Sequence, residues 1–547
     1  MPTHSPHPPI SIPPVDIWSF LFEQTDQEYP EDHVIFSDLA TQKQHTLHSL
    51  RTTSASLGPG LLTQWNWQKG DVMALFTPNS ADIATITFGT LWAGGVVCPM
   101  NNLYTVGELA SLLKSSGAKG LTTHLNCLEV AREAALIVGL PLNRIILIGE
   151  SDPKGRVKHF SYLITEEGSI DGEKKAMVNP KEDLAFLVYS SGTTGLPKGV
   201  MLSHENIVAN ILQSCTPDRE MLDWKNDSMI SFLPMFHIYG LHAMIFIPLY
   251  RGLTMHIMQQ FNLNQLCSTI QASAITVAYV VPPVVLLLAK SPVVDKYDLS
   301  SLRMMHSAAA PLSDDLINMF YKRLKVPIKQ SYGMSEASPA ISSQSWADWN
   351  NPTGSVGKPL PSMSIKVMDG TCEVSRGKEG EIWMRGPNVF KGYYQNPQAT
   401  SESMSEGWFR SGDIGYIDKE GNVFLTDRYK ELIKYNGFQV APAQLEGLLL
   451  GHPAVADVAV VGVYSRERET ELPRAYVVVA KGHYAGKELE REVCEWLHKK
   501  VAPHKRLRGG IRFIDAIPKS AAGKVLRRVL AEQAKNEEDD KRMKPKL

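Results

Sequence analysis

Short apolar runs alternate with amphipathic stretches through residues 30–340. An apolar run at 71–76 precedes apolar positions at helical spacing over 83–92, and a second apolar run begins at 96, directly after Gly94-Gly95. Short apolar runs bounded by turn residues are typical of buried strands, whereas apolar positions about three to four residues apart are typical of a helix face. This repeated order predicts an α/β fold with mostly parallel sheets.

The pattern changes between about 350 and 428, where short strand-like segments are separated by glycine, and it predicts a small β-rich subdomain there. The segment after Arg428 contains new apolar runs and one amphipathic helix. We therefore place a domain boundary after residue 429 and expect two domains, 1–429 and 430–547. The strands expected across both regions lie at 364–368, 381–385, 415–418, 422–425, 456–463 and 474–480, and the expected helix lies at 488–500.

Composition excludes several protein classes. The chain has 547 residues, 43% of them hydrophobic and 21% charged, which is typical of a globular protein with more than one structural unit. Lys and Arg total 56 against 57 Asp and Glu, so the chain lacks the broad positive field of a nucleic-acid-binding protein. The six cysteines show neither CxxC nor Cys/His spacing, and we expect buried thiols rather than disulfides or a zinc site.

The two ends of the chain carry different signals. Residues 1–14 lack the basic and apolar regions of a secretory signal. The longest apolar stretch, 278–289, contains two prolines and is too short to span a membrane, so we expect a buried strand that leads into a helix. The terminal Pro545-Lys546-Leu547 is one residue away from the peroxisomal address Ser-Lys-Leu and predicts binding to a peroxisomal import receptor. An ordinary frayed tail of a cytoplasmic protein is the alternative.

The strongest motif is the segment Tyr189–Val200, which reads YSSGTTGLPKGV. An apolar strand at 184–188 precedes it, and a helix is expected at about 204–213. Such a strand–loop–helix unit offers backbone N–H groups, hydroxyls and one ammonium group, which together bind a polyphosphate. It is not a P-loop, because Pro197 precedes Lys198 and Gly199 follows it.

Five further segments follow in a fixed order, with the sequences LPMFH at 233–237, QSYGMSE at 330–336, FRSGD at 409–413, DRYKE at 427–431 and PKSAAGK at 518–524. With the loop at 189–200 they closely resemble the motifs of the adenylate-forming superfamily, which includes acyl-CoA synthetases, beetle luciferases and peptide-synthetase adenylation domains. The chain is most similar to 4-coumarate–CoA ligase-like enzymes. The resemblance implies a large N-terminal domain of two α/β sheets plus a small β-rich subdomain, and a smaller mobile α+β C-terminal domain that carries the catalytic lysine.

The resemblance also implies a first reaction step, in which a carboxylate attacks the α-phosphate of ATP and pyrophosphate leaves. Lys524 corresponds to the lysine that reaches between the carboxylate and the α-phosphate, Glu336 to the carboxylate that helps hold Mg²⁺, and Asp413 to the acceptor of the ribose hydroxyls. The implied ATP-binding residues are Ser190, Ser191, Gly192, Thr193, Thr194, Gly195, Lys198, Gln330, Tyr332, Gly333, Ser335, Asp413 and Arg428.

In the second implied step, coenzyme A forms the thioester after the C-terminal domain has rotated. Lys430 occupies the matching hinge position, and His237 corresponds to the aromatic residue that separates the acyl pocket from CoA. Lys434, Asn436 and Gly437 resemble the segment that lines the pantetheine tunnel, although Asn436 replaces a lysine that is usual there.

The acyl pocket implied by the resemblance departs from that of 4-coumarate ligases. Ala308 and Ser331 stand where those enzymes have glycine, and Ala340 stands where valine is usual. Single methylene differences discriminate only weakly, by ~1–3 kcal/mol each, so the expected acid is an aryl, arylalkanoic or medium-chain aliphatic acid. The pocket residues are Ile238, Tyr239, His242, Val280, His306, Ala308, Ser331, Pro339, Ala340 and Ile341.

An ATP-dependent carboxylate–CoA ligase is therefore the leading hypothesis. A luciferase-like monooxygenase and an adenylation enzyme that delivers the acyl group to a carrier protein share the same motifs. A catalytically inactive homologue is disfavoured, because Lys198, Glu336, Asp413, Arg428 and Lys524 are all present.

Overall fold

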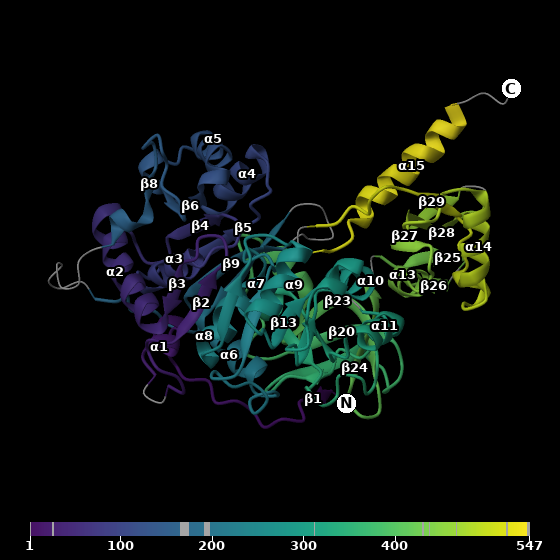
Figure 1. The fold of residues 1–547 in the computed structure, drawn as a ribbon, viewed down its shortest axis with the longest axis horizontal. Helices are drawn as coiled ribbons and strands as arrows, with labels where there is room; N and C mark the ends of the chain where they lie inside the picture. Colours follow the sequence, from purple (N-terminus) through teal and green to yellow (C-terminus); the bar gives the residue numbers. More distant parts are fainter. Residues whose placement is uncertain are drawn as a thin grey trace.

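Parallel strands with helices on both faces form the two large sheets of the protein, as the alternating sequence pattern predicts (Figure 1). The structure is a computed structural model that describes residues 2–24, 27–164, 174–190, 197–310, 312–428, 431–436, 438–465, 468–520 and 523–543. The large α/β part, the β-rich subdomain and the smaller C-terminal part confirm the predicted fold class. The predicted boundary after residue 429 remains a prediction, because residues 429 and 430 lie outside the described residues.

The first sheet has eight strands within the described residues, in the order β21-β10-β9-β5-β4-β6-β7-β8. Helices α2 and α3 pack on one face with the main hydrophobic core, and α4 and α5 pack on the other face around a second core. The strands are β4 (Val72–Phe76), β5 (Val96–Met100), β6 (Gly120–His124), β7 (Ile145–Ile148), β8 (Lys158–His159), β9 (Leu184–Ser190), β10 (Lys198–Ser203) and β21 (Gly392–Tyr393). The helices are α2 (Leu47–Trp65), α3 (Asp82–Trp92), α4 (Val106–Ser116) and α5 (Leu128–Val138).

The second sheet has nine strands in the described part of the chain, in the order β17-β16-β15-β14-β13-β11-β12-β2-β3. Its central strands are parallel, and antiparallel strands close both edges. The strands are β2 (Val34–Asp38), β3 (Gln44–Thr46), β11 (Ser228–Ser231), β12 (Thr254–Ile257), β13 (Val277–Val280), β14 (Met304–Ser307), β15 (Ile328–Gly333), β16 (Ala340–Ser343) and β17 (Lys358–Pro359). The helices near it are α1 (Ile17–Phe22), α6 (His204–Cys215), α7 (Ile238–Leu241), the π-helix His242–Phe246, α8 (Ile247–Arg251), α9 (Leu263–Ala272), α10 (Pro282–Lys290) and α11 (Asp314–Leu324).

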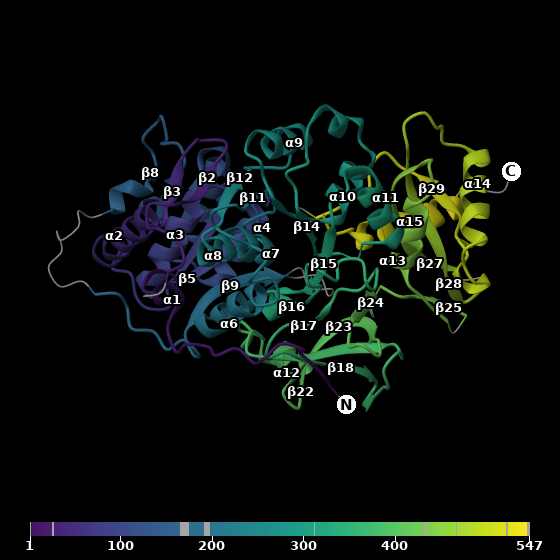
Figure 2. The same ribbon diagram turned by 60° about the horizontal axis from the view of Figure 1, so that its bottom comes forward.

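The third sheet forms the β-rich subdomain, which lies at the bottom of Figure 2. Its unexpected member is β1 (Thr3–His4), which pairs with β18 although about 360 residues separate the two strands. The proline-rich N-terminal segment is therefore part of the fold. The other members are β18 (Ser364–Asp369), β19 (Cys372–Glu373), β20 (Gly380–Arg385), β22 (Met404–Ser405), β23 (Trp408–Ile417) and β24 (Val423–Arg428), with helix α12 (Pro397–Ser403) beside them.

The C-terminal part has a hydrophobic core of its own and lies on the right of both views (Figures 1 and 2). Its main sheet has the order β27-β28-β29, and a separate hairpin joins β25 to β26. The strands are β25 (Ile433–Tyr435), β26 (Phe438–Val440), β27 (Val455–Ser465), β28 (Thr470–Val479) and β29 (Ile511–Phe513), and the helices are α13 (Pro442–Leu450), α14 (Lys487–His498) and α15 (Arg527–Met543).

One local prediction is wrong. The phosphate-binding segment does not pass from a strand through a loop into a helix, because β10 stands between the loop and α6. β10 pairs antiparallel with β9, with Lys198 opposite Ser190. The apolar residues that follow Gly199 bury themselves on the sheet edge, and this pairing outweighs the strand-to-helix pattern. β9 and β10 thus form an antiparallel pair, and residues 191–196 between them lie outside the described residues.

The cysteines are free thiols, as expected from their spacing. Cys98, Cys127, Cys215 and Cys267 are buried, whereas Cys372 is exposed and Cys494 is half-buried, so the expectation of buried thiols holds for four of them. No helix among the described residues is long and apolar enough to cross a membrane.

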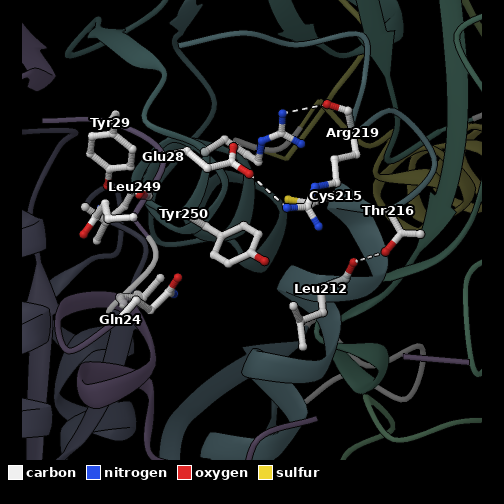
Figure 3. A pocket seen from close by; sticks show the side chains of 12 residues that line it. Gln24, Glu28, Tyr29, Leu212, Cys215, Thr216, Arg219, Leu249 and Tyr250 are labelled. Atoms are coloured by element: carbon white, nitrogen blue, oxygen red, sulfur yellow. Dashed lines mark hydrogen bonds and ion pairs between the residues drawn. The ribbon is translucent and has the colours of Figure 1, made fainter. Parts of the chain in front are cut away.

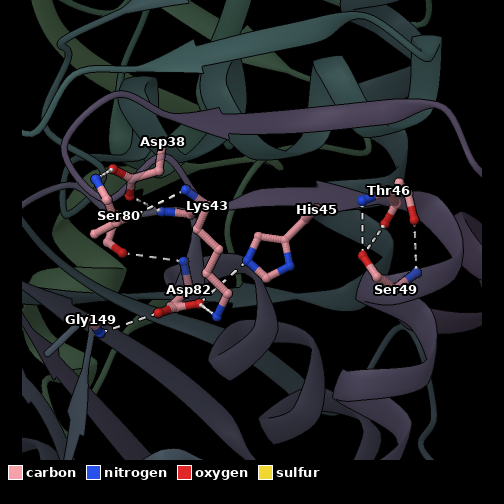
Figure 4. Close-up of polar contacts among 10 residues, drawn as sticks. Asp38, Lys43, His45, Thr46, Ser49, Ser80, Asp82 and Gly149 are labelled. Carbon is pink, nitrogen blue, oxygen red and sulfur yellow. Dashed lines mark hydrogen bonds and ion pairs between the residues drawn. The ribbon is translucent and has the colours of Figure 1, made fainter. Parts of the chain in front are cut away.

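A buried carboxylate ties the two large sheets together (Figure 4). Asp82, the first residue of α3, accepts hydrogen bonds from Lys43 at 2.5 Å and from the backbone N–H of Gly149 at 3.2 Å, and the ring of His45 lies 3.3 Å away. Lys43 and His45 belong to the β2–β3 hairpin of the second sheet, whereas α3 and Gly149 belong to the first. Burial disfavours the carboxylate, but the contacts with His45 and Lys43 outweigh it and hold the pKa of Asp82 below its usual value.

We expect Asp82→Asn to lower the free energy of unfolding by about 2 kcal/mol. This is less than for a fully buried pair, because Lys43 is 43% exposed and can return to water. Because the carboxylate pKa is lowered in the folded state, its contribution is present above the unfolded value near pH ~4 and shrinks as the pH falls below it. Urea unfolding at several pH values measures both effects. Glu31→Gln, in the exposed pair with Arg51, is the control and should leave the midpoint unchanged.

Candidate active site

A largely apolar cavity opens beside the carboxyl-terminal halves of β13, β14 and β15. Ligands of open parallel sheets characteristically bind at this edge. The cavity encloses about 860 Å³ free of protein atoms, part of it open to solvent, and it extends from His237 to Lys329. We call it the acid cavity. Its walls come from α6, the turns of α7 and α8, β15 and the segment at 333–340.

Polar side chains in the cavity wall are paired with one another. His306 Nε2 lies 2.8 Å from Ser331 Oγ, and His242 Nε2 lies 3.0 Å from Ser214 Oγ. Burial lowers the pKa of His242 to about 3 and lowers the pKa of His306 well below its usual value, so both imidazoles are neutral. The wall therefore offers an apolar surface on which these two imidazoles are neutral hydrogen-bonding groups.

Eight of the ten acyl-pocket residues expected from the sequence line this cavity. The exceptions are Val280 and Ile341, which are completely buried in β13 and β16 and contribute to the core instead. The predictions for these two residues are wrong, because neighbouring positions of a strand point to opposite faces of the sheet. Sequence reasoning missed the wall residues Ser214, Cys215, Asp218, Leu222, Ile247, Arg251, Tyr279, Ala309, Lys329, Met334, Ser343 and Leu360.

One of the missed residues is a buried lysine. Lys329 lies in β15, and a buried lysine needs a partner. Its partner is Asp218, which lies 111 residues away and forms a buried ion pair with it. Nothing in the local sequence around Asp218 indicates this contact.

Tyr332, Asp413 and Arg428 form a connected group next to the acid cavity. The Tyr332 hydroxyl donates a 2.6 Å hydrogen bond to Asp413 Oδ2, and Arg428 Nε lies 3.3 Å from Asp413 Oδ1. Asp413 and Arg428 are direct neighbours across β23 and β24. Burial and the negative charge of Asp413 raise the pKa of Tyr332, so its phenol stays protonated and donates. This group presents a carboxylate that can accept hydroxyl donors.

Glu336 lies at the base of the phosphate-binding hairpin. Its Oε1 accepts hydrogen bonds from the hydroxyl of Tyr393 at 3.0 Å and from Ser190 Oγ at 3.4 Å. Lys198 Nζ lies 4.9 Å above the ring of Tyr393. The hairpin thus brings one cation and one carboxylate together. Among the described residues there is no cluster of three or more His, Cys, Asp or Glu that could hold a metal ion alone.

Lys524 reaches this site from the C-terminal part of the chain. A tight turn holds it, in which Gly523 has φ +79° and the N–H of Ser520 donates a 2.7 Å hydrogen bond to the carbonyl of Lys524. The side chain keeps access to solvent within the cleft. Burial by the surrounding protein and repulsion by Arg428 lower the pKa of Lys524 to about 8, although Asp413, Glu431 and Glu336 act against this shift. Lys524 is therefore close to both acids of the site.

His237 lies at the end of the acid cavity nearest to Lys524. Its Nδ1 accepts a 3.2 Å hydrogen bond from the N–H of Tyr239 and so caps α7, which leaves the ring proton on Nε2. Burial and the charge of Lys524 lower the pKa of His237 to about 4. Lys524 consequently stands where the acid cavity meets Glu336 and Asp413.

Three residues expected to contact ATP, Gln330, Ser335 and Gly333, are held by hydrogen bonds, burial or close packing within the protein. The buried Gln330 side chain donates to the carbonyl of Ser355 at 3.3 Å and accepts from the N–H of Leu312 at 3.2 Å. Ser335 is buried in a single 3₁₀ turn. Gly333 lines the cavity, and a Cβ there would lie 2.4 Å from the carbonyl oxygen of Pro339.

The predicted CoA-binding segment lies apart from the acid cavity. Lys434 and Asn436 belong to the β25–β26 hairpin, where Asn436 has φ +47° and its N–H donates to Thr470 Oγ1 of β28 at 2.8 Å. Neither residue lines the acid cavity, whereas Lys524 lies close enough to it to affect the pKa of His237. The other predicted site residues Ser191, Gly192, Thr193, Thr194, Gly195, Lys430 and Gly437 lie outside the described residues.

The arrangement agrees with comparisons against known proteins. Sequence models of the AMP-binding enzyme and of the AMP-binding enzyme C-terminal domain match residues 22–394 and 444–524. The chain belongs to the AMP-binding enzyme family.

Relatives of this AMP-binding enzyme match it almost from end to end. A probable 4-coumarate–CoA ligase 1 of Dictyostelium discoideum is 37% identical over 548 residues, which cover 96% of each chain. The 4-coumarate–CoA ligase 3 of Arabidopsis thaliana is 39% identical over 471 residues, which cover 85% of this chain and 82% of that one. The crystal structure of ATP-bound MatB from Rhodopseudomonas palustris is similar with a TM-score of 0.82 and 28% identity, covering 95% of this chain and 99% of that chain.

We expect Gly333→Ala to weaken AMP binding about tenfold, because the added Cβ cannot fit beside the carbonyl of Pro339 and must displace the adjoining Tyr332. Calorimetric titration with AMP measures this. Gly107→Ala is the matched control, since a Cβ at Gly107 meets no atom within 4 Å. Equal AMP affinity in the two variants would contradict the close approach at Gly333.

Proposed function

We propose that the chain is an ATP-dependent carboxylic acid–CoA ligase, which forms an acyl-adenylate and then an acyl-CoA thioester. The position of Lys524 carries the proposal. Its amine interacts electrostatically with His237, which lines the acid cavity, and with the two acids Glu336 and Asp413. A single ammonium group is thereby available where a carboxylate and a phosphate, both negative, have to meet.

In the first step a carboxylate oxygen attacks the α-phosphorus of ATP, and the bond to pyrophosphate breaks. The ribose hydroxyls donate to Asp413, whose carboxylate Tyr332 and Arg428 hold in place. Lys198 and the hairpin turn bind the leaving phosphates. Lys524 contacts both the carboxylate and the α-phosphate and reduces their repulsion, so the chemistry depends on positioning and charge.

Mg²⁺ is the expected metal, and Glu336 fits it. Mg²⁺ is usually held by one or two carboxylates together with substrate phosphates and water rather than by an all-protein cage. A lone carboxylate beside the phosphate-binding hairpin meets that description. The ion, when bound, supplies positive charge to the phosphate oxygens.

In the second step the sulfur of CoA attacks the acyl carbon, AMP leaves, and the thiol proton is released to solvent. His237 is neutral and lies between the acid cavity and Lys524, so it can separate the acyl group from the incoming thiol without adding charge. The β25–β26 hairpin with Lys434 and Asn436 would contact CoA only after the C-terminal part has moved, since neither residue lines the acid cavity in this structure.

The acid cavity favours a compact acid. The side chains of Ala308 and Ser331, which stand where 4-coumarate ligases have glycine, both reduce its space. Its far wall includes Cys215 and Arg251, which also line a separate surface pocket of about 670 Å³ (Figure 3). Because Cys215 is small and borders both the acid cavity and the surface pocket, the wall between them is one side chain thick there. An aryl, arylalkanoic or medium-chain aliphatic acid is the substrate class that we propose for this cavity.

A panel of acids with ATP, Mg²⁺ and CoA tests the function. We expect one of these three classes to give thioester and AMP in equal amounts, and C14–C16 fatty acids to react at least ~10-fold more slowly. Lys524→Ala should lower the adenylation rate about 10²–10³-fold, because it removes the charge that offsets the developing repulsion. Pyrophosphate, AMP and thioester are followed together.

Release of pyrophosphate without thioester would contradict CoA as the acceptor. It would indicate a carrier protein or, if light is emitted with luciferin, oxygen. No pyrophosphate with any acid would contradict the proposed chemistry as a whole.

The pKa of Lys524 predicts a pH dependence for the first step alone. The protonated amine is the active form, so kcat/KM for acid-dependent pyrophosphate exchange should fall as the pH rises through about 8. Lys524→Arg stays charged and should lack this decline, whatever its absolute rate. The same decline in both proteins would assign it to another group.

The peroxisomal address remains a prediction from the sequence, because Pro545-Lys546-Leu547 lies outside the described residues.

A further inference from the structure

Helix α10 lies between the second sheet and the C-terminal part of the chain (Figure 2). At its last residue, Lys290 Nζ donates 3.1 Å hydrogen bonds to the carbonyl oxygens of Leu450 and Val455, which are 160 and 165 residues away. Leu450 ends α13, and the last carbonyls of a helix have no partner within the helix. A cation there is also favoured by the helix dipole. Lys290 therefore caps a helix of the C-terminal part from outside it.

The other end of α10 lies near the turn that carries Lys524. A Cβ placed on Gly523 would lie 3.6 Å from both Pro283 Cγ and Val281 Cγ2, which is ordinary van der Waals distance, so the glycine itself leaves a small space there. Pro283 is in the first turn of α10, and Val281 immediately precedes the helix. One nine-residue helix thus lies beside the C-terminal part at both of its ends. Since a helix of this length is rigid and about 13 Å long, it fixes the turn of Lys524 relative to the end of α13.

A second close contact supports the same orientation. Helix α13 approaches the start of α11 so closely that a Cβ on Gly447 would lie 3.1 Å from Ser313 Cβ. At Gly451 an added Cβ would lie 3.2 Å from Asp315 Oδ2. Two glycines on the C-terminal side allow this approach, so the contact depends on the absence of side chains there.

We propose that Lys290 is a positioning residue for adenylation: it docks α13 against α10 and so holds Lys524 in the active site. The proposal rests on the proposed ligase function. Lys290 does not line the acid cavity, so its effect passes through the placement of Lys524. The second step needs no cation between a carboxylate and a phosphate, so it should not depend on this contact.

The test measures the two steps separately. Lys290→Met should lower acid-dependent pyrophosphate exchange about tenfold, through kcat more than through KM for the acid, because it removes charge-assisted hydrogen bonds. Thioester formation from a supplied acyl-adenylate and CoA should change less than ~2-fold. Lys290→Arg keeps the donors and should retain most of the exchange rate. Lys296→Met, an exposed lysine six residues further on, is the matched control and should behave as wild type.

Gly447→Leu keeps the test decisive if Lys290→Met does not fold. Leucine is a good helix former within α13, but its side chain cannot fit against Ser313. The rate of pyrophosphate exchange should therefore fall, while thioester formation is retained. Gly447→Ala should lower the exchange rate less. Equal losses in both steps, or an unchanged exchange rate, would overturn the proposal. A wild-type enzyme without either step would instead refute the ligase function.

Discussion

The proposed chemistry depends on bringing one ammonium group, that of Lys524, to the place where the carboxylate of the acid and the α-phosphate of ATP must react. Lys524 belongs to the C-terminal part, whereas Glu336 and Asp413 belong to the second and third sheets. Burial and Arg428 lower the pKa of Lys524, and the two acids act against this shift, so the neighbours of Lys524 at the site set its charge. The contacts of α10 and α13 fix the position of the C-terminal part and so hold Lys524 at the site.

The remaining architecture gives each substrate its own structural unit. The acid lies against the second sheet, with neutral imidazoles in its wall, and the ribose site lies on β23 and β24 of the third sheet. The phosphate hairpin belongs to the first sheet. The site lies where these units meet, and contacts such as the Asp82 cluster hold the first and second sheets together.

The sequence predicted the fold class, most elements and eight cavity residues, because motifs and apolar periodicity are local signals. The strand β10 after the phosphate loop was not predicted, since it forms by pairing with β9 and with the distant β21. Val280 and Ile341 were misplaced by one face of a strand. The partners of Lys329 and Lys290 were not predictable, because each contact joins residues more than 100 positions apart. Lys290 also donates to backbone carbonyl oxygens, which every residue has.

The first strand of the chain has a consequence for solubility. β18 would be an edge strand of the third sheet without its short pairings with β1 and β19. In the pairing with β1, Thr3 faces Ile365 and His4 faces Ser364. An uncovered edge offers unpaired N–H and C=O groups to a strand of another molecule and so promotes aggregation. The first few residues thus act as a cover for this edge, and a chain trimmed to its catalytic motifs would lose this protection while keeping every residue of the active site.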